Sequence, residues 1–105
     1  MLYESNGPIT RVSVDASDEA TLKAAATGFR QRILAASLVA GAAGATFTVK
    51  SASTGIVGTI ILAANGHWLL PASGIGYCET DAGEALILDV TAGAVGGVVT
   101  VQTIK

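Results

Sequence analysis

A chain of 105 residues is long enough for one domain, and its net charge of −2 excludes the basic surface that nucleic-acid phosphates require. Half of the residues are hydrophobic, which excludes an intrinsically disordered chain, and the single cysteine excludes an intramolecular disulfide. Only 13% of the residues are charged, so we expect part of the surface to meet a partner.

Alternating apolar and polar residues, the pattern of β-strands, begin at residues 9–15 (ITRVSVD). Residues 19–25 follow with weaker alternation. An N-cap candidate at Ser17 and several alanines leave a short helix over residues 15–26 open as the alternative. Residues 29–40 (FRQRILAASLVA) are the longest run. Their second half is apolar on both faces, which predicts a central strand covered on both sides.

The pattern continues to the C-terminus with shorter runs. Residues 45–51 (ATFTVKS) alternate most clearly, with Ala45, Phe47 and Val49 on one face. Glycine-rich segments such as GAAG and AGAVGG separate the runs as turns or loops, and Asn65-Gly66 predicts a tight turn. The other predicted strands are residues 56–63, 67–70, 76–80, 84–91 and 98–104.

Eight or nine short strands in about a hundred residues predict an all-β protein, a single β-sandwich that is jelly-roll-like with about eight strands. Since the chain has only two Phe, two Tyr and one Trp, we expect Phe29, Phe47 and Trp68 to be the few large aromatic side chains of its core. The longest apolar run, residues 33–45, is too short to span a bilayer, and the first residues lack a secretory signal pattern. We therefore expect a protein made in the cytoplasm, with no membrane partner.

Reactive side chains gather in residues 66–84 (GHWLLPASGIGYCETDAGE), which hold the only His, Trp and Cys of the chain. Cys78 and His67 are a nucleophile and a base, so a hydrolase is one interpretation. The alternative is a small buried Cys78 in a strand and a solvated His67 in a loop. An active site also needs a cleft and perturbed pKa values, so we expect no enzyme and no catalytic residues.

The same stretch holds oxygen and aromatic groups that suggest other sites. Glu79, Asp81 and Glu84 are candidate Ca²⁺ ligands, but their spacing is not that of an EF-hand loop. We therefore expect solvated loop charges, with no metal and no cofactor. Trp68 and Tyr77, with Tyr3, are the candidate aromatic residues of a carbohydrate-binding module. A Trp that caps one end of the core is the alternative.

Several short motifs also follow one another in a distinctive order. Toward the C-terminus they are Leu70-Pro71, Gly76–Thr80, Asp81–Leu86, Leu88–Val90 and Val95–Val101, and upstream they are Arg32–Val39, Ala45–Ser51 and Thr59–Gly66. Across residues 20–103 this order resembles small bacteriophage virion proteins of the capsid decoration (cement) or head-fibre type. Ala-Gly-Glu-Ala-Leu at residues 82–86 is the most specific part. Cys78 stands where the family usually has an apolar or aromatic residue.

The resemblance implies a subunit of the virion, on the capsid surface, made in the host bacterial cytoplasm. Such a protein binds the major capsid protein and stabilises the head by bridging capsomers, with no catalytic residues and no small-molecule substrate. A small tail or head fibre component with a receptor- or glycan-binding role is the alternative. Closed cyclic association would bury the apolar surplus of the chain, and we expect a homotrimer.

The N-terminal segment lies outside the resemblance. We divide the chain into residues 1–18, an arm or first strand that contacts the capsid or another subunit, and residues 19–105, the β-sandwich domain. Leu2, Tyr3 and Pro8 are the expected contact residues of this arm, and a frayed terminus is the alternative.

Overall fold

The computed structural model describes residues 6–105, and these residues form eight β-strands of one antiparallel sheet, without a helix. The predicted all-β class is therefore confirmed. Within this range no helix is long and apolar enough to cross a membrane. The strands are β1 (Asn6–Ala16), β2 (Glu19–Lys23), β3 (Arg30–Ser51), β4 (Thr54–Gly55), β5 (Ile60–Leu62), β6 (His67–Leu70), β7 (Cys78–Glu79) and β8 (Leu86–Ile104).

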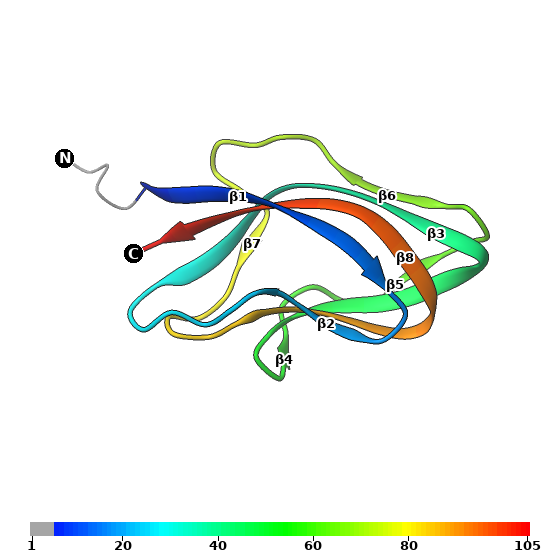
Figure 1. The fold of residues 1–105 in the computed structure, drawn as a ribbon, viewed down its shortest axis with the longest axis horizontal. Helices are drawn as coiled ribbons and strands as arrows, with labels where there is room; N and C mark the ends of the chain where they lie inside the picture. The colour runs from blue at the N-terminus through cyan, green and yellow to red at the C-terminus, as the bar shows by residue number, and fades with distance from the viewer. Residues whose placement is uncertain (1–5) are drawn as a thin grey trace.

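Two long strands, β3 and β8, pair along nearly their whole length and fold over together (Figure 1). Arg30–Ala40 of β3 pairs with Val95–Ile104 of β8, and Ala45–Ser51 pairs with Leu86–Gly93. Between these two stretches the register shifts, and both strands turn back toward the end at which they began. The single sheet thereby becomes two layers packed face to face, which agrees with the predicted single β-sandwich.

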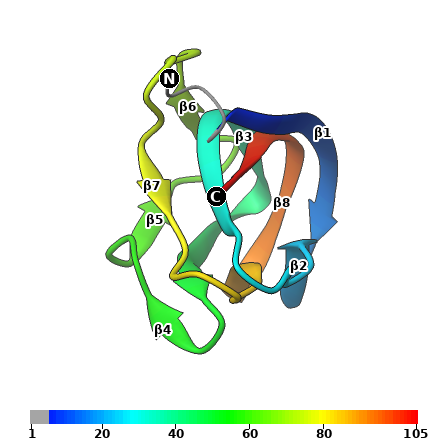
Figure 2. The same cartoon turned by 90° about the vertical axis from the view of Figure 1, so that its left-hand side faces the viewer.

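Each layer contains one half of β3 and one half of β8. Layer A consists of β1, the C-terminal half of β8, the N-terminal half of β3, β6 and β7. Layer B consists of β2, the N-terminal half of β8, the C-terminal half of β3, β5 and β4. A view along the long axis shows β1 and β2 on one side of the molecule and β4, β5 and β7 on the other (Figure 2).

The core lies between the layers and is built of branched aliphatic side chains around one aromatic pair. Phe47 is fully buried, and its ring meets Trp68 edge-to-face, with the ring centroids 5.3 Å apart. This contact joins layer B, which holds Phe47, to layer A, which holds Trp68. Phe29, predicted as a third large core residue, is only half-buried at a turn before β3 and lies outside the buried cluster. The other large buried residues are Ile33, Leu38, Val49, Leu86, Leu88, Val95, Val99 and Val101.

A β-bulge explains why residues 33–40 of β3 look apolar on both faces in the sequence. Ile33 faces the core before the register shift at Leu34, and Leu38 faces it afterwards. Ser37 and Val39 are exposed, so the prediction of a strand covered on both sides was wrong. One extra residue moves every following side chain to the other face, and two out-of-phase stretches then look apolar throughout.

The glycine segments at residues 41–44 and 92–97, predicted as turns or loops, lie inside β3 and β8 at the fold-over. Gly44 and Gly93 have φ values of +78° and +70°, where a side chain is strained. A Cβ atom on Gly93 would also clash with the Gly44 carbonyl oxygen. The glycines therefore bend the two strands at their closest approach rather than end them.

The remaining predictions hold in part. Residues 19–23 form a strand, so the helix considered over residues 15–26 does not occur. Of residues 56–63, only Ile60–Leu62 is a strand. The Asn65-Gly66 turn is present, with Asn65 at φ +57°. The strands on its two sides, β5 and β6, pair with β3 in different layers instead of with each other.

Candidate functional site

The fold separates the two candidate catalytic side chains. Cys78 pairs with Ile33 of β3 and His67 pairs with Val39, and six residues of strand span about 20 Å. Cys78 packs against the core, whereas His67 is exposed on the outer face of layer A. The two side chains therefore face opposite sides of the layer and do not form a nucleophile–base pair.

The environment of Cys78 also works against a reactive thiol. Burial raises the pKa of the Cys78 thiol above its ordinary value of 9.0, and the negative charge of neighbouring Glu79 raises it further. A nucleophilic cysteine requires the opposite shift, since the thiolate is the reacting species. Cys78 is a packing residue in this structure.

Two of the three candidate calcium ligands, Glu79 and Glu84, are engaged by the chain's own side chains. Glu79 accepts hydrogen bonds from Arg30 and Arg32, each at 3.1 Å. Glu84 accepts a hydrogen bond from the Ser51 hydroxyl, whose oxygen in turn accepts the Asp81 backbone N–H at 3.0 Å. No group of three His, Cys, Asp or Glu residues within the described chain is placed to hold a metal ion.

A buried polar cluster, which the sequence analysis did not identify, lies at the end of the sandwich opposite the fold-over. Gln31 and Thr80 are fully buried and exchange hydrogen bonds, with the Gln31 N–H donating to Thr80 Oγ1 at 2.9 Å. The Gln31 side chain also accepts the Thr103 hydroxyl at 2.7 Å. Each of these polar atoms has a hydrogen-bond partner within the chain, so the cluster links the ends of β3, β7 and β8.

A shallow depression lies at the fold-over. It has a volume of about 160 Å³ and no titratable side chain at its wall. Its lining residues are Ala43, Gly44, Ala45, Thr46, Ile61, Leu62, Ala92 and Gly93. Such a wall offers no acid, base or nucleophile to a bound molecule.

Trp68 and Tyr77, the two candidate aromatic residues within the described part of the chain, do not make a platform for sugars. Trp68 pairs with Leu38, whose side chain is buried, and its ring packs on Phe47 inside the sandwich. The predicted alternative, a Trp that caps the core, is therefore confirmed. Tyr77 is exposed on the connection between β6 and β7, and its hydroxyl donates to the Pro71 carbonyl oxygen. Tyr3 lies outside the described residues.

The outer face of layer A is the most distinctive surface of the molecule. Its cross-strand rows follow from the register: Ser13–Val98–Ser37–Leu69 forms one row and Asp15–Gly96–Val39–His67 the next. Leu69 is 65% exposed, Val98 40% and Val39 37%. Between β1 and His67 these two rows hold only apolar, small or hydroxyl side chains. We call Ser37, Val39, Leu69, Gly96 and Val98 the apolar face.

The outer face of layer B is polar by comparison. Its rows are Glu19–Asp89–Thr48 and Thr21–Ile87–Lys50. Lys50 and Asp89 form an ion pair at 2.7 Å, and this hydrogen bond raises the pKa of Lys50. The only large apolar side chain well exposed on this layer's described strands is Ile61. The two broad surfaces of the sandwich therefore differ in kind.

The expected contact residues of the N-terminal arm divide between two regions. Leu2 and Tyr3 lie outside the described residues. Pro8 is exposed and lies within β1, next to the register shift between Asn6 and Ile9. From Asn6 onward, therefore, this segment is part of the sandwich.

Comparison with known proteins gives no relative: no family model matches the chain, and no curated protein or solved structure is significantly similar to it.

Proposed function

We propose that this protein is a phage capsid decoration (cement) protein, which binds the outer surface of the major capsid protein through the apolar face and stabilises the head by bridging capsomers. The observation that carries the proposal is the contrast between the two layers. A monomer gains nothing by exposing Val39, Leu69 and Val98 together on one face of a sheet, whereas a docking surface requires a group of exposed apolar side chains.

The rest of the site is compatible with a binding role. The reactive residues Cys78, Glu79 and Glu84 are each used in packing or in ion pairs and hydrogen bonds within the chain. A rigid sandwich loses little conformational freedom on binding, and many copies on a repeating lattice add avidity, so each contact needs only modest affinity. The order of sequence motifs described above supports a virion location.

The proposal is tested on virions and isolated heads of the phage whose genome carries the gene. Mass spectrometry of purified virions should find the chain in many copies, and purified protein should cosediment with heads that lack it. Leu69→Lys should weaken head binding at least about tenfold, because it places an ammonium group at the most exposed apolar side chain of the contact. Ile61→Lys, an equivalent change on layer B, is the matched control and should bind as the unaltered chain does.

Absence of the chain from virions, or equal head binding by Leu69→Lys and the unaltered chain, would refute the proposal. The alternative, a tail or head fibre component, is favoured by the exposed Ile75 and Tyr77 on the connection between β6 and β7. That role predicts a few copies per virion, found with the tail or fibre fraction, and binding that Ile75→Lys reduces and Leu69→Lys does not.

A further inference from the structure

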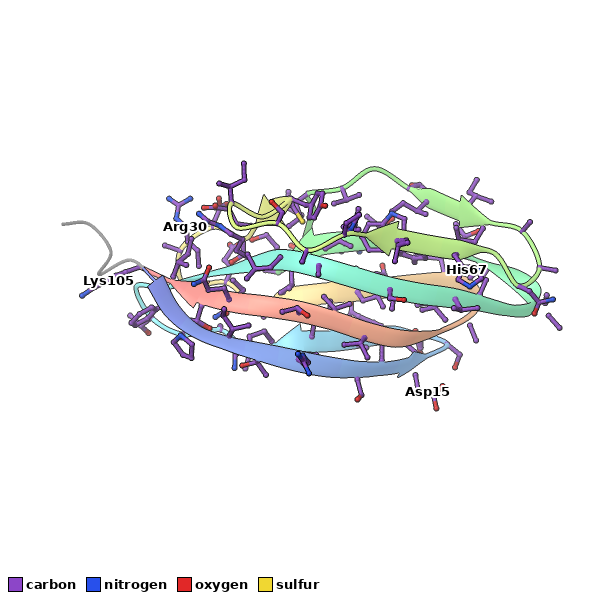
Figure 3. The ribbon with its side chains drawn as sticks, turned by 90° about the horizontal axis from the view of Figure 1, so that it is seen from above. Asp15, Arg30, His67 and Lys105 are labelled. Atoms are coloured by element: carbon purple, nitrogen blue, oxygen red, sulfur yellow. The ribbon has the colours of Figure 1, made fainter. Side chains whose placement is uncertain are left out.

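The strand β1 has one edge that no other strand of the described chain covers. It pairs with β8 on one side and is the last strand of the sheet on the other. Figure 3 shows it as the outermost ribbon of its layer, with Asp15 near its end. Alternate residues of such a strand direct N–H and C=O groups away from the sheet, ready to pair with another chain.

Two of the devices that protect natural edge strands, a proline and an irregular register, are confined to the beginning of β1. Pro8 and the register shift between Asn6 and Ile9 interrupt that part of the strand. Residues 10–16 contain no proline, no bulge and no lysine, and they pair with β8 in unbroken register. At eleven residues, β1 is also longer than the other edge strand on this side, β2, which has five.

The order of the side chains along β1 is complementary to the same order in a second copy of the strand that runs in the opposite direction. Val12 and Val14 face the interior, whereas Arg11, Ser13 and Asp15 are exposed on the outer side. Arg11 and Asp15 are four residues apart, about 13 Å along a strand, so they do not reach each other. The ion pairs of the described chain are Arg30–Glu79, Arg32–Glu79 and Lys50–Asp89, which involve neither residue.

We propose that β1 pairs with β1 of a second copy of this chain, antiparallel and about a two-fold axis at Ser13. In this register Ser13 lies opposite the partner's Ser13, Val12 opposite the partner's Val14, and Arg11 opposite the partner's Asp15. Each dimer then gains two cross-strand ion pairs on the outer face and two valine pairs on the inner face. Opposite charges at directly facing positions stabilise a sheet, and like charges destabilise it.

The other registers fail for physical reasons. Directly opposite residues of two paired strands lie on the same face of the sheet. A register that places odd-numbered residues opposite even-numbered ones would therefore put the buried valines of one copy on the same face as the exposed residues of the other, which is unfavourable because one face of each strand is buried. Centring the axis on Arg11 or on Asp15 places like charges opposite each other. Centring it on Val12 or on Val14 leaves both charges without a partner. Only the axis at Ser13 pairs every charge and every valine.

The pairing also has a consequence for the surface. It joins layer A of two copies into one continuous sheet and brings their two apolar faces onto the same side of it. The proposal rests on β1 alone and holds whether or not the protein binds capsids.

A disulfide trap tests the register directly. In a Cys78→Ala background, Ser13→Cys places two thiols at directly opposite positions, where Cβ atoms are about 4.5–5.5 Å apart. We expect mild oxidation to link most of the chains into covalent dimers. Ile9→Cys is the matched control: it is exposed on the same strand and face, but two copies of Ile9 lie about 26 Å apart in this register and should not crosslink.

Charge reversal tests the same register without a crosslink. Light scattering of the unaltered chain should give the mass of two chains, and Arg11→Asp should raise the dissociation constant about tenfold or more, because two like-charge pairs replace two ion pairs. The double variant Arg11→Asp/Asp15→Arg should restore the dimer. Circular dichroism confirms that each variant is folded, as expected for exposed side chains.

Three outcomes would overturn the pairing. The first is a monomer at the highest soluble concentration. The second is a mass of three chains, which would instead support the homotrimer expected from the sequence. The third is failure of either variant test: equal crosslinking of Ser13→Cys and Ile9→Cys, or a double charge variant whose dimer is no tighter than that of Arg11→Asp.

Discussion

At the scale of single residues, the groups that look chemically active in the sequence serve the structure. Trp68 packs on Phe47, Glu79 forms ion pairs with two arginines, and Cys78 packs on the core. The sequence could predict that Phe47 and Val49 are buried, because strict alternation defines the face of a strand. It could not predict that Phe29 stays half-buried. Alternation shows which residues share one face of a strand, but it does not show at which residue the strand begins.

The state of Cys78 leads to a prediction about thiol reactivity. Its folded pKa is raised, so at neutral pH the native thiol should alkylate more slowly than the thiol of the urea-unfolded chain. The midpoint of the native pH profile should lie above pH 9.0, at a higher pH than the midpoint of the unfolded chain. Stopped-flow alkylation of the native and unfolded chains measures both quantities. A native thiol that reacts as fast as the unfolded one, or titrates below its ordinary value, would contradict this.

The same shift has a consequence for stability. A group whose pKa is higher in the folded state stabilises the fold while it is protonated in both states, and this contribution is lost as the pH rises through the folded pKa. The difference in unfolding free energy between the unaltered chain and Cys78→Ala should therefore be constant below about pH 8 and should shrink above pH 9.0. Urea titrations of both chains across this range measure the difference.

At the scale of strands, the elements and their faces were largely predictable and their continuity was not. The stretches 29–40 and 45–51 were both predicted as strands, and the structure joins them as β3. Glycines between strands normally indicate a turn, and nothing in residues 41–44 alone distinguishes a turn from a bend. What makes residues 41–44 a bend rather than a turn is β8, whose Gly93 lies against Gly44 across the sheet. A single segment of sequence does not reveal such a long-range contact.

This contact makes Gly93 a sensitive position. Gly93→Ala combines a left-handed backbone with a clash against the Gly44 carbonyl, so it should lower the free energy of unfolding by about 2–4 kcal/mol. Gly58→Ala is the matched control, since a Cβ there meets nothing within 4 Å, and it should change stability by less than about 0.5 kcal/mol. Urea denaturation followed by Trp68 fluorescence measures both. Equal stabilities of the two variants would show that the fold-over tolerates a side chain.

At the scale of the whole molecule, every pairing that closes the sandwich joins distant parts of the chain. β8 comes last in sequence, yet it lies between β1 and β3 and pairs with β2 as well. Its nearest partner in sequence is Ser51, opposite Leu86, and its farthest is Asn6, opposite Ile104. The asymmetry of the two outer faces also belongs to this scale. It depends on which halves of β3 and β8 share a layer, and the sequence alone did not show this.

The late position of β8 predicts slow folding. Loop closure has to be completed before long-range strand pairs contribute stability, and all-β domains of this kind fold in milliseconds to seconds. The contact between Phe47 in layer B and Trp68 in layer A forms only when the layers meet, so the fluorescence of the single Trp reports closure of the sandwich.

After dilution from urea in a stopped-flow instrument, the main phase of the Trp68 signal should last milliseconds to seconds. Its rate should not depend on protein concentration, because closure precedes any pairing of β1 between chains. Completion of the Trp68 signal within microseconds would mean that local structure, and not the β3–β8 pairing, limits the rate. A concentration-dependent main phase would mean that the sandwich closes only when two chains associate.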